Sequence, residues 1–162
     1  EPIATLDDEA DEPDRPDRFE ARRAFWTQLL DHAKSRSNLH ANISPSKYHW
    51  AGTRREGMWW NYWVTQHETR VTLYIDGPDA AANKAVFDAL SAQRLAVEQA
   101  FGGTLEWQRN EGKRASWIGI RLPGGWVDES TWPQVTEQAV DAMGRLYAAL
   151  GPLVRDIRGQ SG

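Results

Sequence analysis

Apolar side chains recur every three to four residues in three stretches of the chain, which is the spacing of an amphipathic helix. The first stretch predicts a helix over 18–36, with Asp17 placed to cap it through its carboxylate. The second predicts a helix over 78–101, and the third predicts one over 132–150. We expect Pro152 to break or kink this last helix, because proline lacks the N–H that would donate to the preceding turn.

Alternating polar and apolar residues fill the stretches between these helices, and this period of two is typical of strands. The alternation predicts strands at 47–51, 58–65, 70–76, 104–109 and 115–122. Short polar turns join the second strand to the third and the fourth to the fifth, so both pairs form antiparallel hairpins. The order α-β-β-β-α-β-β-α predicts an α+β fold, with an antiparallel sheet of about five strands and three amphipathic helices.

The second predicted strand carries three tryptophans within five residues, in the run GMWWNYWVTQ. Trp60 shares a face with Met58, Tyr62 and Val64, which favours a place in the core. Trp59 and Trp63 fall on the opposite face. They either pack under another element or remain open, where paired indole rings could stack on nucleobases.

Charge is distributed unevenly along the chain. Residues 1–20 hold nine acidic and two basic side chains, whereas residues 21–162 carry a net charge of +3. Residues 1–17 are acidic and contain three prolines, so we expect a disordered acidic linker there. A second interpretation is that this acidic segment covers a basic patch. We expect one α+β domain over 18–158 and a flexible C-terminus at 159–162.

The basic residues of the predicted strands and their turns are candidates for contacts with nucleic-acid phosphates. A solvated surface would explain the same residues, since lysine and arginine lie outside in most proteins. Combined with the two undecided tryptophans, the predicted nucleic-acid-binding residues are Lys47, Arg54, Arg55, Trp59, Trp63, Lys113 and Arg114.

No catalytic constellation can be recognised in the sequence. Glu111-Gly112-Lys113 has the acid-x-lysine spacing of metal-dependent nucleases, but it lies in a predicted turn without an obvious partner acid. The four histidines lack zinc-site spacing, and the chain has no cysteine. We therefore expect no catalytic residue, no metal and no cofactor. The absence of cysteine fits a reducing cytoplasm, and no apolar run is long enough to cross a membrane.

Several short motifs resemble the bacterial and archaeal family called domain of unknown function 4268. They include Tyr74-Ile75-Asp76, Asn83-Lys84, Phe87-Asp88 and Lys113-Arg114-Ala115, and the similarity extends from about Arg22 to Ile157. The resemblance implies a C-terminal module of a longer protein, with a restriction-endonuclease-like domain upstream. It implies no catalytic residues. The chain differs from the family pattern in one strand, where it has the tryptophans Trp59, Trp60 and Trp63.

Two functions remain open after this comparison. The chain is a nucleic-acid-binding or target-sensing module that serves a nuclease-like or defence-related protein, with DNA or RNA and the upstream domain as partners. Alternatively, it is a module for homodimerisation or other protein interaction without contact to nucleic acid.

Overall fold

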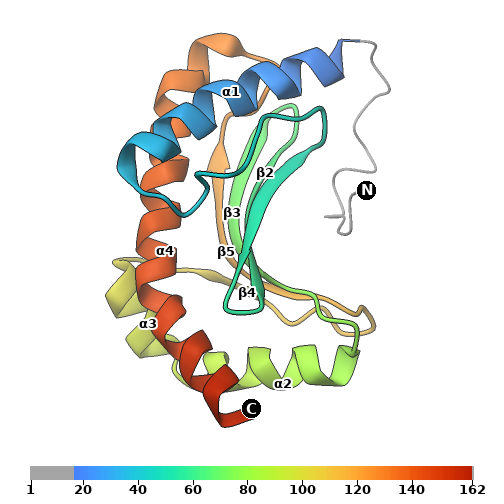
Figure 1. The fold of residues 1–162 in the computed structure, drawn as a ribbon, viewed down its shortest axis with the longest axis vertical. Helices are drawn as coiled ribbons and strands as arrows, with labels where there is room; N and C mark the ends of the chain where they lie inside the picture. The colour runs from blue at the N-terminus through green and yellow to red at the C-terminus, as the bar shows by residue number, and fades with distance from the viewer. Residues whose placement is uncertain (1–16, 162) are drawn as a thin grey trace. The chain divides into compact units, whose positions relative to one another are not determined.

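The computed structural model describes residues 17–161, so the predicted linker at 1–17 lies outside the described residues except for Asp17. The fold is α+β, as the sequence predicts, with an antiparallel five-stranded sheet in the order β1-β2-β3-β5-β4 (Figure 1). Its elements are α1 (Arg18–Arg36), β1 (Trp50–Arg55), β2 (Met58–Val64), β3 (Glu68–Ile75), α2 (Ala80–Ser91), α3 (Arg94–Phe101), β4 (Glu106–Gln108), β5 (Ser116–Pro123), the 3₁₀ helix η2 (Glu129–Thr131) and α4 (Trp132–Ser161).

The first strand begins and ends later than its sequence pattern predicts. In place of the predicted strand at 47–51, the structure has a strand that runs from Trp50 through Arg55, followed by a tight turn at Glu56 and Gly57. Both turn residues have positive φ, 56° and 77°, which is the backbone signature of a type I′ turn between antiparallel strands. Glycine at the second position takes up this conformation without a steric penalty.

The helix predicted over 78–101 is two helices. The N-cap of α2 is Asp79, whose carboxylate accepts a 3.0 Å hydrogen bond from the Ala81 N–H. The helix breaks at Ala92 and Gln93, and α3 then ends at Gly102, where φ is 90°. Helical spacing did not reveal the break because Leu90 and Val97 are both buried on either side of it. At α1, Asp17 is the N-cap residue, but its side chain makes no cap hydrogen bond.

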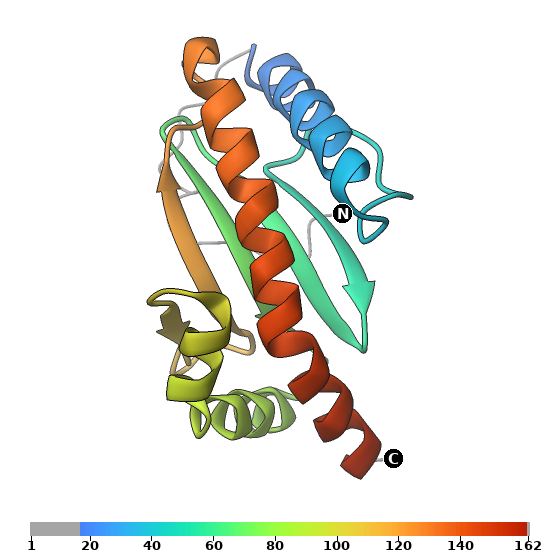
Figure 2. The same cartoon turned by 90° about the vertical axis from the view of Figure 1, so that its left-hand side faces the viewer.

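Pro152 does not break the last helix, which was one of the two outcomes, a break or a kink, that the sequence predicts. Helix α4 continues to Ser161, into the residues predicted to form a flexible C-terminus (Figure 2). Pro152 is exposed, whereas Leu150 and Val154 beside it are completely buried. The missing proline N–H costs one helical hydrogen bond, and the burial of these two side chains offsets that cost.

The described chain divides into two compact units. The first contains residues up to Thr53, Asn61–Val71 and Arg121–Asp141. In this unit, α1 lies beside the first turns of α4 (Figure 2), and the Phe25 ring packs edge-on against Trp132 at 5.5 Å. Trp26 is fully buried and donates a 2.8 Å hydrogen bond from its indole N–H to the Tyr48 carbonyl.

The second unit contains Arg54–Trp60, Thr72–Ile120 and the residues from Ala142 onward. Trp60 is completely buried, as its strand position predicts, and packs edge-on against Tyr147 of α4 at 4.8 Å. Phe87 of α2 is buried against Trp107 of β4, with ring centroids 6.2 Å apart. Arg54, Arg55, Lys113 and Arg114 belong to this unit.

Candidate nucleic-acid interface

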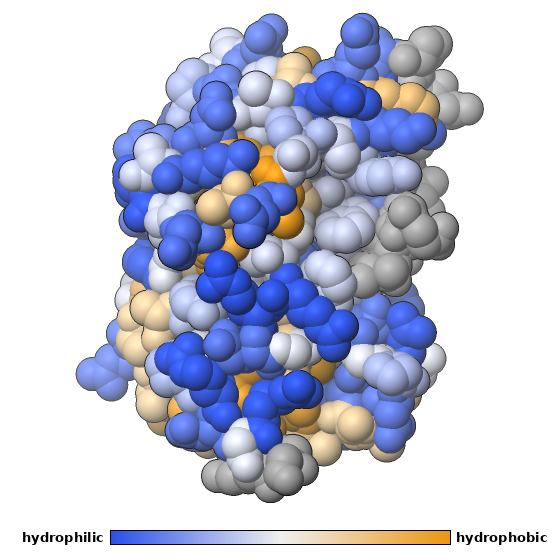
Figure 3. Space-filling view, in the orientation of Figure 1, coloured by the Kyte–Doolittle hydropathy of each residue, from blue (hydrophilic) through white to orange (hydrophobic). Residues whose placement is uncertain are grey.

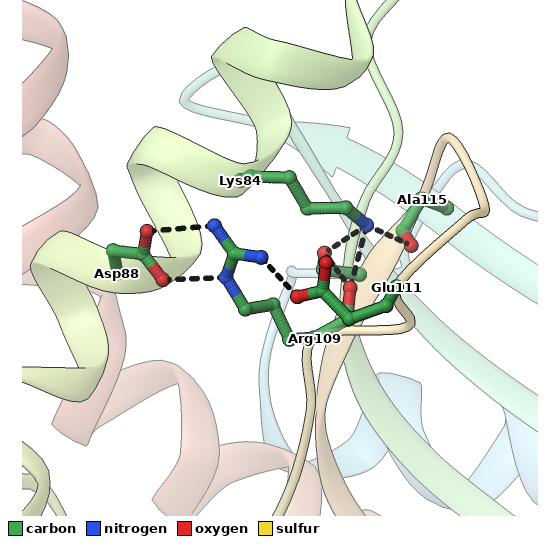
Figure 4. Close-up of polar contacts among 6 residues, drawn as sticks. Lys84, Asp88, Arg109, Glu111 and Ala115 are labelled. Atoms are coloured by element: carbon green, nitrogen blue, oxygen red, sulfur yellow. Dashed lines mark hydrogen bonds and ion pairs between the residues drawn. The ribbon is translucent and has the colours of Figure 1, made fainter.

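Lys84 joins α2 to the segment that connects β4 and β5 (Figure 4). Its ammonium donates to the carbonyl oxygens of Arg109 and Ala115, at 2.5 and 2.9 Å, and to the Ser116 hydroxyl at 2.8 Å. A lysine ammonium has three N–H donors, and these three acceptors use all of them. Burial lowers the pKa of Lys84. Lys84 therefore has a structural role, which is to hold α2 against this segment. In its charged form the ammonium has no lone pair that could act as a base or nucleophile.

Asn83, the neighbour of Lys84, makes a second connection to the same segment. Its amide Nδ2 donates to the carbonyls of Gly77 and Arg114, at 3.0 and 2.9 Å, while Oδ1 accepts from the Gly77 N–H at 2.9 Å. The Arg114 guanidinium in turn donates two hydrogen bonds, 2.7 and 3.0 Å, to the carboxylate of Asp76. Asp76 is only 2% exposed at its side chain, whereas Arg114 is 53% exposed.

Asp88 and Arg109 form a third connection, a two-point ion pair with distances of 2.8 and 3.0 Å (Figure 4). The same guanidinium donates to Glu111. Hydrogen bonding from Arg109 lowers the pKa of Asp88, and hydrogen bonding to Asp88 and Glu111 raises that of Arg109. Glu111 thus lies in a turn and pairs with an arginine, and no cluster of three or more metal-ligating side chains occurs within residues 17–161.

A separate group of basic residues surrounds the turn between β1 and β2. Glu56 in this turn accepts a 3.0 Å hydrogen bond from the hydroxyl of Tyr147, and its other oxygen lies 3.8 Å from an Arg155 nitrogen. Gly57 lies directly against Arg158, because a Cβ at this glycine would be only 2.6 Å from the guanidinium carbon. The turn therefore holds the last turns of α4 against the hairpin.

We call Arg54, Arg55, Arg155 and Arg158 the hairpin arginine group. Arg155 and Arg158 are three residues apart on α4 and so lie on one side of the helix. Glu56 supplies one carboxylate beside Arg155, and Asp156 lies between the two helical arginines in sequence. Figure 3 shows hydrophilic side chains gathered on the face where Figure 1 places the end of this hairpin.

Within the described residues, the excess of basic over acidic side chains lies in the second unit. This unit holds ten basic and eight acidic residues, whereas the described part of the first unit holds eight of each. Arg54, Arg55, Lys113 and Arg114 all belong to the second unit, as do the two helical arginines. Arg155 and Arg158 were not among the residues predicted from the sequence, because the expected break at Pro152 hid their helical spacing.

The remaining predicted residues are placed differently. Lys47 belongs to the first unit, where its ammonium lies 5.3 Å from the centre of the Phe19 ring. Trp63 is 1% exposed, with its ring 5.8 Å from that of His49, which favours the packed alternative over an open stacking surface. The rings of His49 and Trp50 lie beside it. Trp59 is partly buried.

The chain belongs to the family described as domain of unknown function (DUF4268), which it matches over residues 21–154. No curated protein and no solved structure matches it significantly. The motifs that carry the family resemblance include Asp76, Asn83-Lys84, Asp88 and Arg114. These residues connect α2 and the end of β3 to the segment between β4 and β5. Arg155 and Arg158 lie beyond the matched residues. None of the described helices is long and apolar enough to cross a membrane.

Proposed function

We propose that this chain is a nucleic-acid-binding module that contacts the phosphate backbone through the hairpin arginine group. The observation that carries the proposal is the contact of Glu56 and Gly57 with α4, which brings Arg155 and Arg158 beside the turn that directly follows Arg54 and Arg55 in the chain. Planar guanidinium groups bind phosphate oxygens with two parallel hydrogen bonds, and a strand hairpin and a helix end fix their positions.

Exposed basic groups of the β4–β5 connection extend this interface within the second unit. Lys113 is exposed, and the Arg114 guanidinium stays half exposed although Asp76 binds one of its edges. By contrast, Lys84 and Arg109 are committed to internal hydrogen bonds and ion pairs. The proposed interface therefore draws on arginines and one lysine at turns and a helix end.

Binding of this kind is directed at the backbone more than at the bases. Trp63 is buried and Trp59 is partly buried, so the indole rings are not an exposed pair for base stacking. Phosphate contacts fix position and orientation but carry no sequence information of their own. We accordingly propose weak sequence preference, with affinity dominated by charge.

The module would position a catalytic partner on nucleic acid. The family resemblance implies a restriction-endonuclease-like domain in the same polypeptide, and a domain that grips phosphates suits such a neighbour. We propose that the chain itself supplies binding and that any cleavage belongs to that other domain, acting in the cytoplasm.

Self-association through an apolar surface has less support. The exposed large apolar side chains among residues 17–161 are Phe19, Leu95 and Val127. Phe19 lies under the cations of Arg18 and Lys47. Leu95 is 84% exposed but stands among polar or small neighbours on α3. Single exposed apolar residues are common on monomeric proteins, and we propose a monomer.

The test is binding of DNA and RNA duplexes and single strands by the double variant Arg54→Ala/Arg158→Ala. Its matched control, Arg23→Ala/Lys34→Ala, removes the same charge from exposed positions on α1. The proposal expects the first variant to bind all sequences more weakly by a similar factor, while the control binds like the parent. Equal affinity of both variants, or no binding by the parent chain at low salt, would contradict it.

A further inference from the structure

Asp76 directly follows β3, and its buried carboxylate meets the guanidinium of Arg114. Nε and Nη2 of Arg114 donate to the two carboxylate oxygens at 2.7 and 3.0 Å, so the pair is held at two points. The Asp76 side chain is 2% exposed, whereas that of Arg114 is 53% exposed. One edge of the guanidinium therefore lies against a buried anion, while the side chain as a whole reaches the surface.

The backbone at both members of this pair is held by α2. Asn83 bonds to the N–H and to the carbonyl of Gly77, the residue after Asp76. The same amide donates to the carbonyl of Arg114 at 2.9 Å. Arg114 is thus held at its backbone by α2 and at the end of its side chain by Asp76. This arrangement orders a long and otherwise flexible side chain before any ligand binds.

The ordered guanidinium of Arg114 keeps donors for a second anion. A guanidinium has five N–H donors. Within residues 17–161 the pair with Asp76 uses one at Nε and one at Nη2, which leaves both N–H groups of Nη1 and one of Nη2. The edge between Nη1 and Nη2 can donate two parallel bonds to a phosphate. Arg109 in the same segment differs, because Asp88 and Glu111 together bind its Nε, Nη1 and Nη2 (Figure 4).

The Asp76–Arg114 pair lies at the same end of the sheet as the β1–β2 turn, and both belong to the second unit. β2 and β3 are neighbouring antiparallel strands joined through Thr65 and Glu68, so the start of β2 lies beside the end of β3. The β1–β2 turn directly precedes β2, and Asp76 directly follows β3 (Figure 1). A phosphate backbone that crosses this end of the sheet can therefore contact both the hairpin arginine group and Arg114.

We propose that Asp76 is a positioning residue for nucleic-acid binding, which holds Arg114 so that its Nη1–Nη2 edge receives a backbone phosphate. The inference rests on the proposed function and adds to it one phosphate subsite and the residue that orients it. An acid within a basic surface ordinarily weakens the binding of an anion through repulsion. Asp76 has the opposite effect, because it orders the arginine that makes the contact.

The sign of the effect of Asp76→Asn on affinity tests this role. The proposal expects roughly two- to tenfold weaker binding of a fluorescently labelled oligonucleotide, because one long side chain must then be ordered on binding. The matched control is Asp88→Asn, which makes the same change at the two-point pair with Arg109. Arg109 keeps its partner Glu111, so the control should bind as tightly as the parent or more tightly. Affinity of Asp76→Asn equal to or above that of the parent would overturn the proposal.

Arg114→Lys decides the question if Asp76→Asn does not fold. Lysine keeps the positive charge but can neither form the two-point pair nor present a planar edge to phosphate. The proposal expects affinity to fall by a similar factor, whereas a role of charge alone predicts the affinity of the parent. In the parent chain, the Nε–H signal of Arg114 in a ¹⁵N NMR spectrum should shift when the oligonucleotide is added. An unmoved signal, or parent-like affinity of Arg114→Lys, would overturn the subsite.

The inference and the proposed function fail in different ways. If Arg54→Ala/Arg158→Ala weakens binding while Arg114→Lys does not, the proposed function stands and the role of Asp76 is overturned. If only Arg114→Lys weakens binding, the subsite is supported and the hairpin arginine group is not the interface. A parent chain that binds neither DNA nor RNA at low salt would overturn both.

Discussion

The hydroxyl of Tyr147 on α4 donates a 3.0 Å hydrogen bond to Glu56 in the β1–β2 turn. The Tyr147 ring also packs on buried Trp60. The same side chain therefore contacts the apolar core through its ring and the charged turn through its hydroxyl. It keeps the carboxylate of Glu56 near the helical arginines, where it offsets part of their charge. Replacing this acid therefore tests the interface without removing any arginine.

We expect Glu56→Gln to bind nucleic acid more tightly than the parent chain. The glutamine oxygen still accepts the bond from Tyr147, while one negative charge beside Arg155 is removed. At low salt the gain should be on the order of 1 kcal/mol, the typical value of one exposed charge pair. Affinity measured by fluorescence anisotropy checks this, and an unchanged or weaker affinity would argue against phosphate contacts at this turn.

Glu98 should make stability depend on pH. Its carboxylate accepts hydrogen bonds from the Leu105 N–H at 2.9 Å and from the Trp107 indole at 3.0 Å, and these bonds lower its pKa from the ordinary 4.5. A lowered pKa in the folded state means that this stabilisation is complete above pH 4.5 and is lost as the pH falls through the folded value. The free energy of unfolding of Glu98→Gln should therefore differ most from that of the parent at neutral pH.

The pH experiment has a clear negative outcome. Denaturant unfolding of both chains between pH 3 and pH 7 should show two curves that converge on acidification. Curves that stay parallel over this range would show that the Glu98 carboxylate does not hold the start of the β4 region as the structure indicates.

Phe87→Ala should destabilise the chain severely. Phe87 is 5% exposed and packs on Trp107 between α2 and β4, and truncation of a buried phenylalanine costs about 3–5 kcal/mol. Leu95→Ala, at an 84% exposed position on α3, is the control and should change the free energy of unfolding by less than about 0.5 kcal/mol. Urea denaturation midpoints measure both, and equal midpoints would contradict the packing of α2.

We expect the purified chain to leave DNA uncut in the presence of magnesium or manganese. Glu111 pairs with Arg109 in a turn, and its acid-x-lysine motif has no cluster of further metal ligands within the described part of the chain. The measurement is an agarose-gel cleavage assay with plasmid and single-stranded substrates. Metal-dependent cleavage that disappears in Glu111→Ala would instead assign a nuclease site to this motif.

Local sequence patterns were sufficient for most of the fold but insufficient for the interface. Alternation correctly placed Trp60 in the core and the helical period correctly bounded α1, because burial dictates both patterns. The same reasoning failed at Pro152, where buried neighbours outweighed the local preference of proline. That failure concealed Arg155 and Arg158, and their proximity to the β1–β2 turn depends on tertiary packing that no local pattern records.

The ties around Lys84 illustrate the same limit. Lys84 and Asp88 are one helical turn apart and Asn83 precedes Lys84. Their partners Arg109 and Arg114 lie more than twenty residues away along the chain. A side chain that donates to a backbone carbonyl can pair with any residue type, so the sequence does not show which residue is its partner. The motifs were visible in the sequence, whereas their structural role was not.

The salt dependence of binding tests the central claim most directly. Each phosphate contact releases condensed counterions, so log affinity should fall against log salt with a slope of about −0.7 to −0.9 per contact. Four contacts from Arg54, Arg55, Arg155 and Arg158 predict a slope of roughly −3, and each single alanine variant should flatten it by about one unit. A slope near zero, or a slope that persists unchanged when all four arginines are alanine, would contradict the assignment of this group as the nucleic-acid interface.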